Sequence, residues 1–218
     1  MRDNQPKIRQ MLKEQRKLAR QKASRAGMPS ILIVCEGRET EPNYIAGLCD
    51  AKRVNLAAVK IRPGDSATDA GMLVLKARKI FDGDREYDRV FVVCDDDGSS
   101  MERARQLAQR PLRRSDGKII RVELIVSRPS FEFWLLLHFE YSARPYRSGA
   151  EAMADLRRHL TNYDKADPEI FYAVALGLDQ AMQRAEQLKR ELASTGATVP
   201  DTEFPQLVQQ LLSMRHNG

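Results

Sequence analysis

Residues 31–37 read Ile-Leu-Ile-Val-Cys-Glu-Gly, and residues 90–98 read Val-Phe-Val-Val-Cys-Asp-Asp-Asp-Gly. Each run is apolar without alternation, which is typical of a strand buried on both faces of a sheet. Each run also ends abruptly in acidic residues and glycine. Further strand and helix patterns alternate around them, so the sequence predicts an α/β fold with a parallel sheet, right-handed crossovers and flanking helices.

The other patterns give approximate positions for the remaining elements. Strands are expected near residues 56–61 and 119–126, and helices over about 41–50, 67–81, 100–112 and 131–139, with Thr40 as the cap of the first helix. From Tyr141 onward only helical patterns appear, at about 149–160, 168–175, 179–193 and 204–214. We therefore expect a basic arm over residues 1–28, an α/β core over 29–140 and a helical part over 141–218.

The positive charge is concentrated at the amino terminus. Residues 1–26 contain nine Lys and Arg against Asp3 and Glu14, so this segment carries a charge of +7. The whole chain carries +6, so the remaining residues sum to −1. A basic arm on a near-neutral body indicates a polyanion partner such as nucleic acid, or else a solvated tail. The arm has no aromatic residue that could stack on bases.

The sequence also indicates in which compartment the protein is expected. No run approaches the roughly 18 apolar residues that a membrane helix needs, and no apolar signal segment follows Met1. Cys35, Cys49 and Cys94 are odd in number and lack the spacing of metal ligands, so we expect free thiols, with Cys35 and Cys94 in the core at the ends of strands. A cytoplasmic protein without a membrane partner is the resulting expectation.

The acids at the two strand ends predict a metal site. Ligands of open α/β sheets bind at the carboxyl ends of the strands, so Glu36 should meet Asp95 and Asp97 if the two strands are neighbours. Three such carboxylates repel one another unless a cation such as Mg²⁺ or Mn²⁺ neutralises them. Asp96 should point the other way, because side chains alternate along an extended chain. The alternatives are an ordinary acidic turn, or a haloacid dehalogenase motif with Ser99 in place of its threonine.

Other residues have both a functional and a structural interpretation. Glu132 can be a further catalytic or ligand carboxylate or a helix-capping residue, and Lys165 can contact a scissile phosphate or be a surface lysine. Glu41 can support the site or match the charge of a helix start. His138 and Trp134 fit a buried core better than acid-base or base-stacking roles. The arginines between residues 103 and 114 can hold a nucleic-acid backbone or form a solvated face.

Several motifs resemble those of the RloB-like family, which includes the second component of the AbiL abortive-infection system. These motifs are Val34-Cys35-Glu36-Gly37 with Thr40-Glu41-Pro42-x-Tyr44, then Asp95-x-Asp97, and then Ser127-x-Pro129-Ser130-Phe131-Glu132-x-Trp134 continuing to Phe139. Tyr163-x-Lys165 and Pro200-x-Thr202 also fit. The resemblance covers about residues 30–212, and the basic arm lies outside it.

The resemblance implies a Toprim-like core in which one strand-end glutamate is paired with an Asp-x-Asp. It also implies a nuclease of phage defence or restriction-modification loci that acts beside an ABC-type ATPase. One departure is Asp96, which turns the Asp-x-Asp motif into three consecutive acids.

We therefore expect a Mg²⁺- or Mn²⁺-dependent nuclease acting on DNA or RNA, with Glu36, Asp95 and Asp97 as metal ligands and Glu132 and Lys165 as further catalytic residues. The sequence contains no Gly-x-x-x-x-Gly-Lys-[Ser/Thr] phosphate loop, so ATP hydrolysis is left to a partner. A topoisomerase is excluded by size. The rival hypotheses are a non-catalytic component that docks on an ATPase or nucleic acid, and a small-molecule phosphohydrolase.

Overall fold

The computed structural model describes residues 29–64, 69–96 and 101–214 of the chain. The first elements in chain order are β1 (Ile31–Cys35), α2 (Thr40–Ala51), β2 (Val59–Arg62), α3 (Ala70–Asp82), β3 (Arg89–Asp95), α4 (Met101–Gln109), β4 (Leu112–Arg113), β5 (Ile119–Ile120) and β6 (Val122–Arg128). The elements that follow are α5 (Phe131–Leu136), α6 (Gly149–Leu156), α7 (Ile170–Val174), a 3-10 turn (Ala175–Gly177), α8 (Leu178–Thr195), β7 (Asp201–Thr202) and α9 (Phe204–Leu212).

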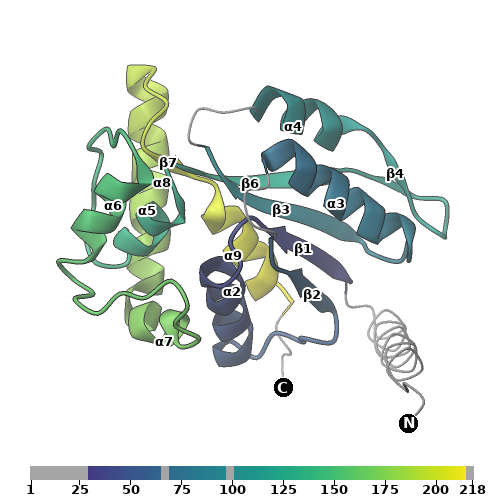
Figure 1. The fold of residues 1–218 in the computed structure, drawn as a ribbon, viewed down its shortest axis with the longest axis horizontal. Coiled ribbons are helices and arrows are strands. Elements are labelled where there is room, and N and C mark those ends of the chain that lie inside the picture. Colours follow the sequence, from purple (N-terminus) through teal and green to yellow (C-terminus); the bar gives the residue numbers. More distant parts are fainter. Residues whose placement is uncertain (1–28, 65–68, 97–100, 215–218) are drawn as a thin grey trace, which may run out of the picture.

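Five strands form the central sheet in the order β2-β1-β3-β6-β7 (Figure 1). The first four strands run parallel, and β7 runs antiparallel to β6. The predicted α/β fold with a mostly parallel sheet, flanking helices and a helical C-terminal part is confirmed. The expectation of helices alone after Tyr141 is wrong, because Thr202 and Asp201 pair with the last two residues of β6. A two-residue strand is too short to show a periodic pattern.

The central strands are buried on both faces because each face carries apolar side chains. Ile31, Ile33 and Cys35 of β1 belong to one apolar cluster, whereas Leu32 and Val34 belong to another. Helices α3 and α4 cover the second cluster, and α2, α5, α8 and α9 pack around the first. In Figure 1, α5 to α8 gather at the left of the view and α3 and α4 lie at the right.

Three local predictions are corrected. Strand β2 lies at Val59–Arg62 rather than near 56–61. Helix α4 ends at Gln109 rather than near residue 112, because Pro111 disfavours the helical conformation at the residue before it. Residues Leu112 and Arg113 instead pair with Ile120 and Ile119 as a small hairpin, so the predicted fourth strand is divided into β5 and β6.

The start of α2 also differs from the prediction. Glu39 occupies the position before the helix and makes no capping hydrogen bond with its side chain, whereas Thr40 is the first helical residue. The Thr40 hydroxyl is used elsewhere, in a contact with the helical C-terminal part described below. In α3, Asp69 does cap the helix, because its carboxylate accepts a hydrogen bond from the Met72 amide at 3.0 Å.

An aromatic cluster joins the two halves of the chain. The ring of Tyr44 in α2 lies 5.5 Å from Phe131, 5.2 Å from Phe171 and 5.4 Å from Phe204, all in edge-to-face contact. Such pairs contribute beyond the burial of their area. Residues on both sides of position 140 therefore share one apolar core, and the domain boundary placed there stays a prediction.

The basic arm over residues 1–28 lies outside the described residues. Among the helices that are described, none combines the length and apolar character that crossing a membrane requires. The three cysteines are buried and free, as predicted for Cys35 and Cys94.

Candidate functional site

The predicted meeting of the two strand ends is confirmed for Glu36 and Asp95. Strands β1 and β3 are hydrogen-bonded neighbours, with Cys35 opposite Val93. The Glu36 amide donates to the Val93 carbonyl at 2.9 Å. In return, the Asp95 amide donates to Glu36 Oε2 at 3.0 Å. The third predicted ligand, Asp97, lies outside the described residues.

Asp96 points away from this pair, as the alternation along β3 predicts. Its carboxylate accepts a hydrogen bond from Arg128 Nε at 3.0 Å, and Arg128 Nη1 donates to Asp201 at 3.1 Å. Asp201 belongs to β7, so this ion pair joins the end of β3 to the edge strand that the sequence did not reveal.

Glu41 supports the turn that follows Glu36. Its side chain is buried in α2, and Oε1 accepts a hydrogen bond from the Gly37 amide at 3.0 Å. Gly64 packs against the same turn, where a Cβ atom would lie 1.7 Å from the Glu36 carbonyl oxygen. Position 64 therefore has no room for a side chain, and the main chain of the turn is enclosed from two sides.

Glu132, in the first turn of α5, is brought to the same place from β6. Its buried carboxylate accepts hydrogen bonds from the Ser130 hydroxyl at 2.7 Å and from the Tyr163 hydroxyl at 3.3 Å. Lys165 Nζ lies 2.7 Å from Glu132 Oε1. The structure thus brings together Glu132 and Lys165, which are 33 residues apart in the sequence.

The first turn of α2 holds the segment that carries Lys165. The Thr40 hydroxyl donates to the Lys165 carbonyl at 2.9 Å. Asn43 Nδ2 donates to the carbonyls of Ala166 at 3.3 Å and Asp167 at 3.2 Å. Sequence reasoning missed this role of Thr40 and Asn43, since a polar side chain near a helix start is equally typical of a cap.

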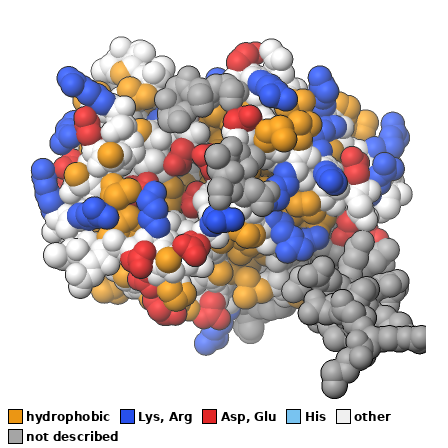
Figure 2. All heavy atoms as spheres, in the orientation of Figure 1, with side chains coloured by type: hydrophobic (Ala, Val, Ile, Leu, Met, Phe, Trp, Pro, Cys, Tyr) orange, Lys and Arg blue, Asp and Glu red, His pale blue; other side chains and the backbone are white. Residues whose placement is uncertain are grey.

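These side chains line one hollow of about 320 Å³, which we call the strand-end pocket. Its lining residues are Glu36, Gly37, Arg38, Glu39, Thr40, Glu41, Asp95, Phe131, Glu132 and Lys165. Figure 2 shows acidic side chains gathered near the middle of the molecular face viewed there, with lysines and arginines to either side.

Negative charge accumulates in the strand-end pocket. Burial raises the pKa of Asp95 well above its ordinary value, and the charges of Glu41 and Glu36 raise it further, against a hydrogen bond from the Phe131 amide. Burial also raises the pKa of Glu41, although the Gly37 amide opposes this effect. The Lys165 ammonium, which binds Glu132, interacts with the charges of both carboxyl groups. The pKa values of Asp95 and Glu41 are nevertheless raised, so burial and repulsion outweigh this interaction, which favours protonation or cation binding.

Glu132 and Lys165 form the one ion pair described in the pocket. Burial acts to raise the pKa of Glu132, but the hydrogen bonds from Lys165 and Ser130 outweigh burial, so this pKa is lowered. Burial acts to lower the pKa of Lys165, and the hydrogen bond to Glu132 outweighs it, so this pKa is raised. Both shifts favour the charged forms.

The described residues do not form a complete metal cage. Within residues 29–64, 69–96 and 101–214, no three His, Cys, Asp or Glu side chains are arranged so that they could hold a metal ion. Glu36 and Asp95 are the two predicted ligands that lie together among the described residues, and Asp97 is outside those residues.

His138 and Trp134 belong to the core rather than to the pocket. His138 is buried, with Nε2 3.0 Å from the Tyr44 hydroxyl and Nδ1 3.1 Å from the Trp134 carbonyl. Because a carbonyl only accepts, Nδ1 carries the proton and Nε2 accepts from Tyr44. Trp134 is completely buried. The structural interpretation of both residues is supported.

The fold and the pocket define an α/β protein whose acidic side chains converge at the carboxyl ends of parallel strands. Residues 31–211 match the family described as RloB-like protein, and the chain belongs to that family. The match begins at the first residue of β1 and extends into α9, so it includes every residue of the strand-end pocket. No curated protein and no solved structure matches the chain.

Proposed function

We propose that this RloB-like protein is a metal-dependent nuclease that hydrolyses phosphodiester bonds of DNA or RNA, with Mg²⁺ or Mn²⁺ bound by Glu36 and Asp95. The observation that carries the proposal is the contact between the Asp95 amide and the Glu36 carboxylate at 3.0 Å. Glu36 and Asp95 come from neighbouring parallel strands and both line the strand-end pocket. This supports the proposal, because ligands of such folds bind at the carboxyl ends of the strands.

The chemistry of the donor set fits a hard cation. Mg²⁺ takes oxygen ligands, keeps several waters, and is held by one or two carboxylates together with substrate phosphates. Glu36 and Asp95 supply such a pair, and Asp97 stays a predicted third ligand. Burial and mutual repulsion raise the pKa of Asp95, which is consistent with a site that a cation would complete. A bound cation would activate water and stabilise the leaving oxygen.

The remaining pocket residues have defined roles in this proposal. The Lys165 ammonium has three protons, and Glu132 Oε1 takes one of them, so the others can contact a phosphate oxygen of the substrate. Glu132 sets the position of that ammonium, and Thr40 holds the Lys165 main chain. Glu41 fixes the Gly37 amide and hence the turn that follows Glu36.

A second candidate is a non-catalytic binding component. It is favoured by the Glu132–Lys165 ion pair, which balances one carboxylate of the pocket without a metal ion. In that case the strand-end pocket would bind its ligand without hydrolysis, and neutralising Glu36 would leave the biological activity unchanged.

The test is a cleavage assay on labelled single- and double-stranded DNA and RNA in Mg²⁺ or Mn²⁺. Glu36→Gln and Asp95→Asn should each lower cleavage by at least about 100-fold, while circular dichroism shows an unchanged fold. Glu186→Gln is the matched control, since Glu186 is exposed on α8. Equal cleavage by all four proteins would mean that the pocket is not catalytic. Hydrolysis of nucleotides without cleavage of polymers would instead favour a small-molecule phosphohydrolase.

We further propose that the nuclease is the effector of an anti-phage system with a separate ABC-type ATPase and a Toprim-like catalytic core. Membership of the RloB-like family and the lack of a phosphate-loop motif in the sequence support this assignment. Cells that carry the ATPase with wild-type protein should resist phage, and cells with the Glu36→Gln variant should not. Undiminished protection by the variant would contradict catalysis and support the binding component.

A further inference from the structure

Arg128 lies at the end of β6, between two acids. Its Nε donates to Asp96 and its Nη1 donates to Asp201, at 3.0 and 3.1 Å. The side chains of Arg128 and Asp96 are mostly buried, with 15% and 17% of their surface exposed. Arginine is always charged and only donates hydrogen bonds, so Arg128 holds both carboxylates near the end of β6, on the side of β7.

Hydrogen bonds also fix the main chain on either side of Asp95. The Asp95 amide donates to the Glu36 carboxylate, and the Asp96 amide donates to the Ser127 carbonyl at 2.9 Å. Asp95 lines the strand-end pocket, whereas the next side chain reaches Arg128. The orientation of one acid is therefore tied to the orientation of the other through two consecutive peptide units.

We propose that Arg128 is a positioning residue that keeps Asp95 in the strand-end pocket. By holding Asp96 toward β7, it leaves Asp95 in the pocket beside Glu36. The consequence for cation binding rests on the proposed function, but the positioning itself is a property of the protein without metal.

Loss of the arginine charge has a predictable consequence. A largely buried carboxylate that loses its cationic partner is strongly destabilised. Without the guanidinium, Asp96 loses the contact that holds it toward β7, and its side chain and main chain can turn. The Asp95 amide thereby leaves the Glu36 carboxylate.

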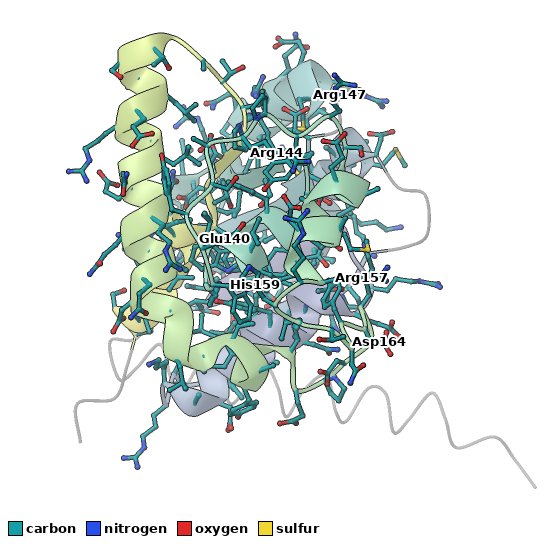
Figure 3. The ribbon with its side chains drawn as sticks, turned by 90° about the vertical axis from the view of Figure 1, so that its left-hand side faces the viewer. Glu140, Arg144, Arg147, Arg157, His159 and Asp164 are labelled. Atoms are coloured by element: carbon teal, nitrogen blue, oxygen red, sulfur yellow. The ribbon has the colours of Figure 1, made fainter. Side chains whose placement is uncertain are left out.

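Four variants separate this role from a general loss of stability. Arg128→Gln removes the contact between Arg128 and Asp96, and Arg128→Gln combined with Asp96→Asn removes the carboxylate charge as well. Asp201→Asn takes away the other partner of the same arginine without touching the acids of β3. Arg144→Gln removes another arginine that binds two acids, Asp155 and Glu151, at a more exposed place that Figure 3 shows.

The first measurement is hydrogen exchange of the Asp95 and Asp96 amides in protein without metal. In Arg128→Gln these amides should exchange at least about 10-fold faster, the effect of losing one hydrogen bond. In the double variant these amides should return toward the wild-type exchange rate. The Asp201→Asn and Arg144→Gln variants should exchange at the wild-type rate. Unchanged exchange in Arg128→Gln, or no recovery in the double variant, would overturn the inference. If Arg128→Gln does not fold, Arg128→Lys replaces it, because an ammonium cannot bridge both acids as the guanidinium fork does.

The second measurement is Mn²⁺ binding by calorimetry. Arg128→Gln should bind about 10-fold more weakly, and the double variant should recover. A wild-type protein that binds no Mn²⁺ would contradict the metal-dependent function, while the exchange rates would still decide the positioning role. Normal Mn²⁺ binding with unaltered exchange in Arg128→Gln would reject the positioning role and leave the proposed function standing.

Discussion

Lys165 Nζ lies 2.7 Å from Glu132 Oε1, although Lys165 comes from the helical C-terminal part and Glu132 follows the parallel strands. The contact completes the strand-end pocket with a cation from outside the α/β core. Thr40 anchors the Lys165 main chain from α2. The pocket is therefore a joint product of three segments that are distant in sequence.

We expect the Glu132–Lys165 pair to be coupled in stability. Lys165→Met leaves a buried carboxylate without its cation, and Glu132→Gln removes that carboxylate. Because Lys165 is 58% exposed, the coupling should be about 1 kcal/mol or less in a double-mutant cycle of urea unfolding. The lowered pKa of Glu132 means that the coupling is present above about pH 4.3 and is lost as the pH falls through the pKa of the folded protein. A coupling of zero at pH 7 would show that the pair does not stabilise the fold.

Asp95→Asn should raise the stability of the metal-free protein. Burial and the neighbouring carboxylates raise the pKa of Asp95, so removing its charge relieves repulsion. We expect the melting temperature to rise by about 2–4 °C for each kcal/mol gained in the free energy of unfolding. The measurement is differential scanning calorimetry in the presence of a chelator. Mn²⁺ should then raise the melting temperature of wild type and of the Glu186→Gln control, but not that of Asp95→Asn. A lower melting temperature in the chelator would argue against repulsion at this site.

Gly64→Ala should damage the turn after Glu36. Its Cβ would lie 1.7 Å from the Glu36 carbonyl oxygen, which is main chain and cannot turn aside as a flexible side chain does. We expect a loss of about 1–3 kcal/mol in urea unfolding and weaker Mn²⁺ binding. Gly83→Ala is the matched control, because the nearest atom to its Cβ is at 3.6 Å, and its stability should change by less than about 0.5 kcal/mol. Equal effects at the two glycines would contradict the close approach.

His138 should make the protein less stable in mild acid. Burial lowers the pKa of His138 to about 4, so this histidine stays neutral in the folded protein while the unfolded chain binds a proton near pH 6.5. The unfolded state therefore binds more protons as the pH falls, and about 3 kcal/mol of stability should be lost between pH 6.5 and pH 4.

The measurement for His138 is urea unfolding at several pH values between 7 and 4.5. His138→Asn should reduce the slope of stability against pH, whatever its effect at pH 7. His159→Asn is the control, because His159 is 30% exposed beside Glu140. An unchanged slope in His138→Asn would mean that another group causes the acid sensitivity.

Part of the site could be predicted from local sequence alone. The unbroken apolar runs that end in Glu36 and Asp95 identify two central parallel strands, and such strands end at the same edge of a sheet. Alternation along β3 also predicted that Asp96 points away from Asp95. Both predictions depend on periodicities that neighbouring residues determine by themselves.

Other parts of the site depend on contacts between distant segments. The two residues of β7 have no pattern, yet they bring Asp201 to Arg128. Thr40 looks like a helix cap in the sequence, but its hydroxyl binds the Lys165 carbonyl. Helical periodicity placed Lys165 only in a loop between helices, with no indication of its partner.

Local sequence patterns are enough to predict the α/β class, the buried parallel strands and the acids at their ends, because burial on two faces demands continuous apolar runs and leaves polar residues to the strand ends. The pairing of Glu132 with Lys165, the support of the Gly37 turn by Glu41 and the contact of Arg128 with Asp96 depend on how distant segments pack together. The difference lies in sequence distance. Backbone periodicity is set by adjacent residues, whereas a buried charge pairs with whichever residue folding brings within hydrogen-bond distance.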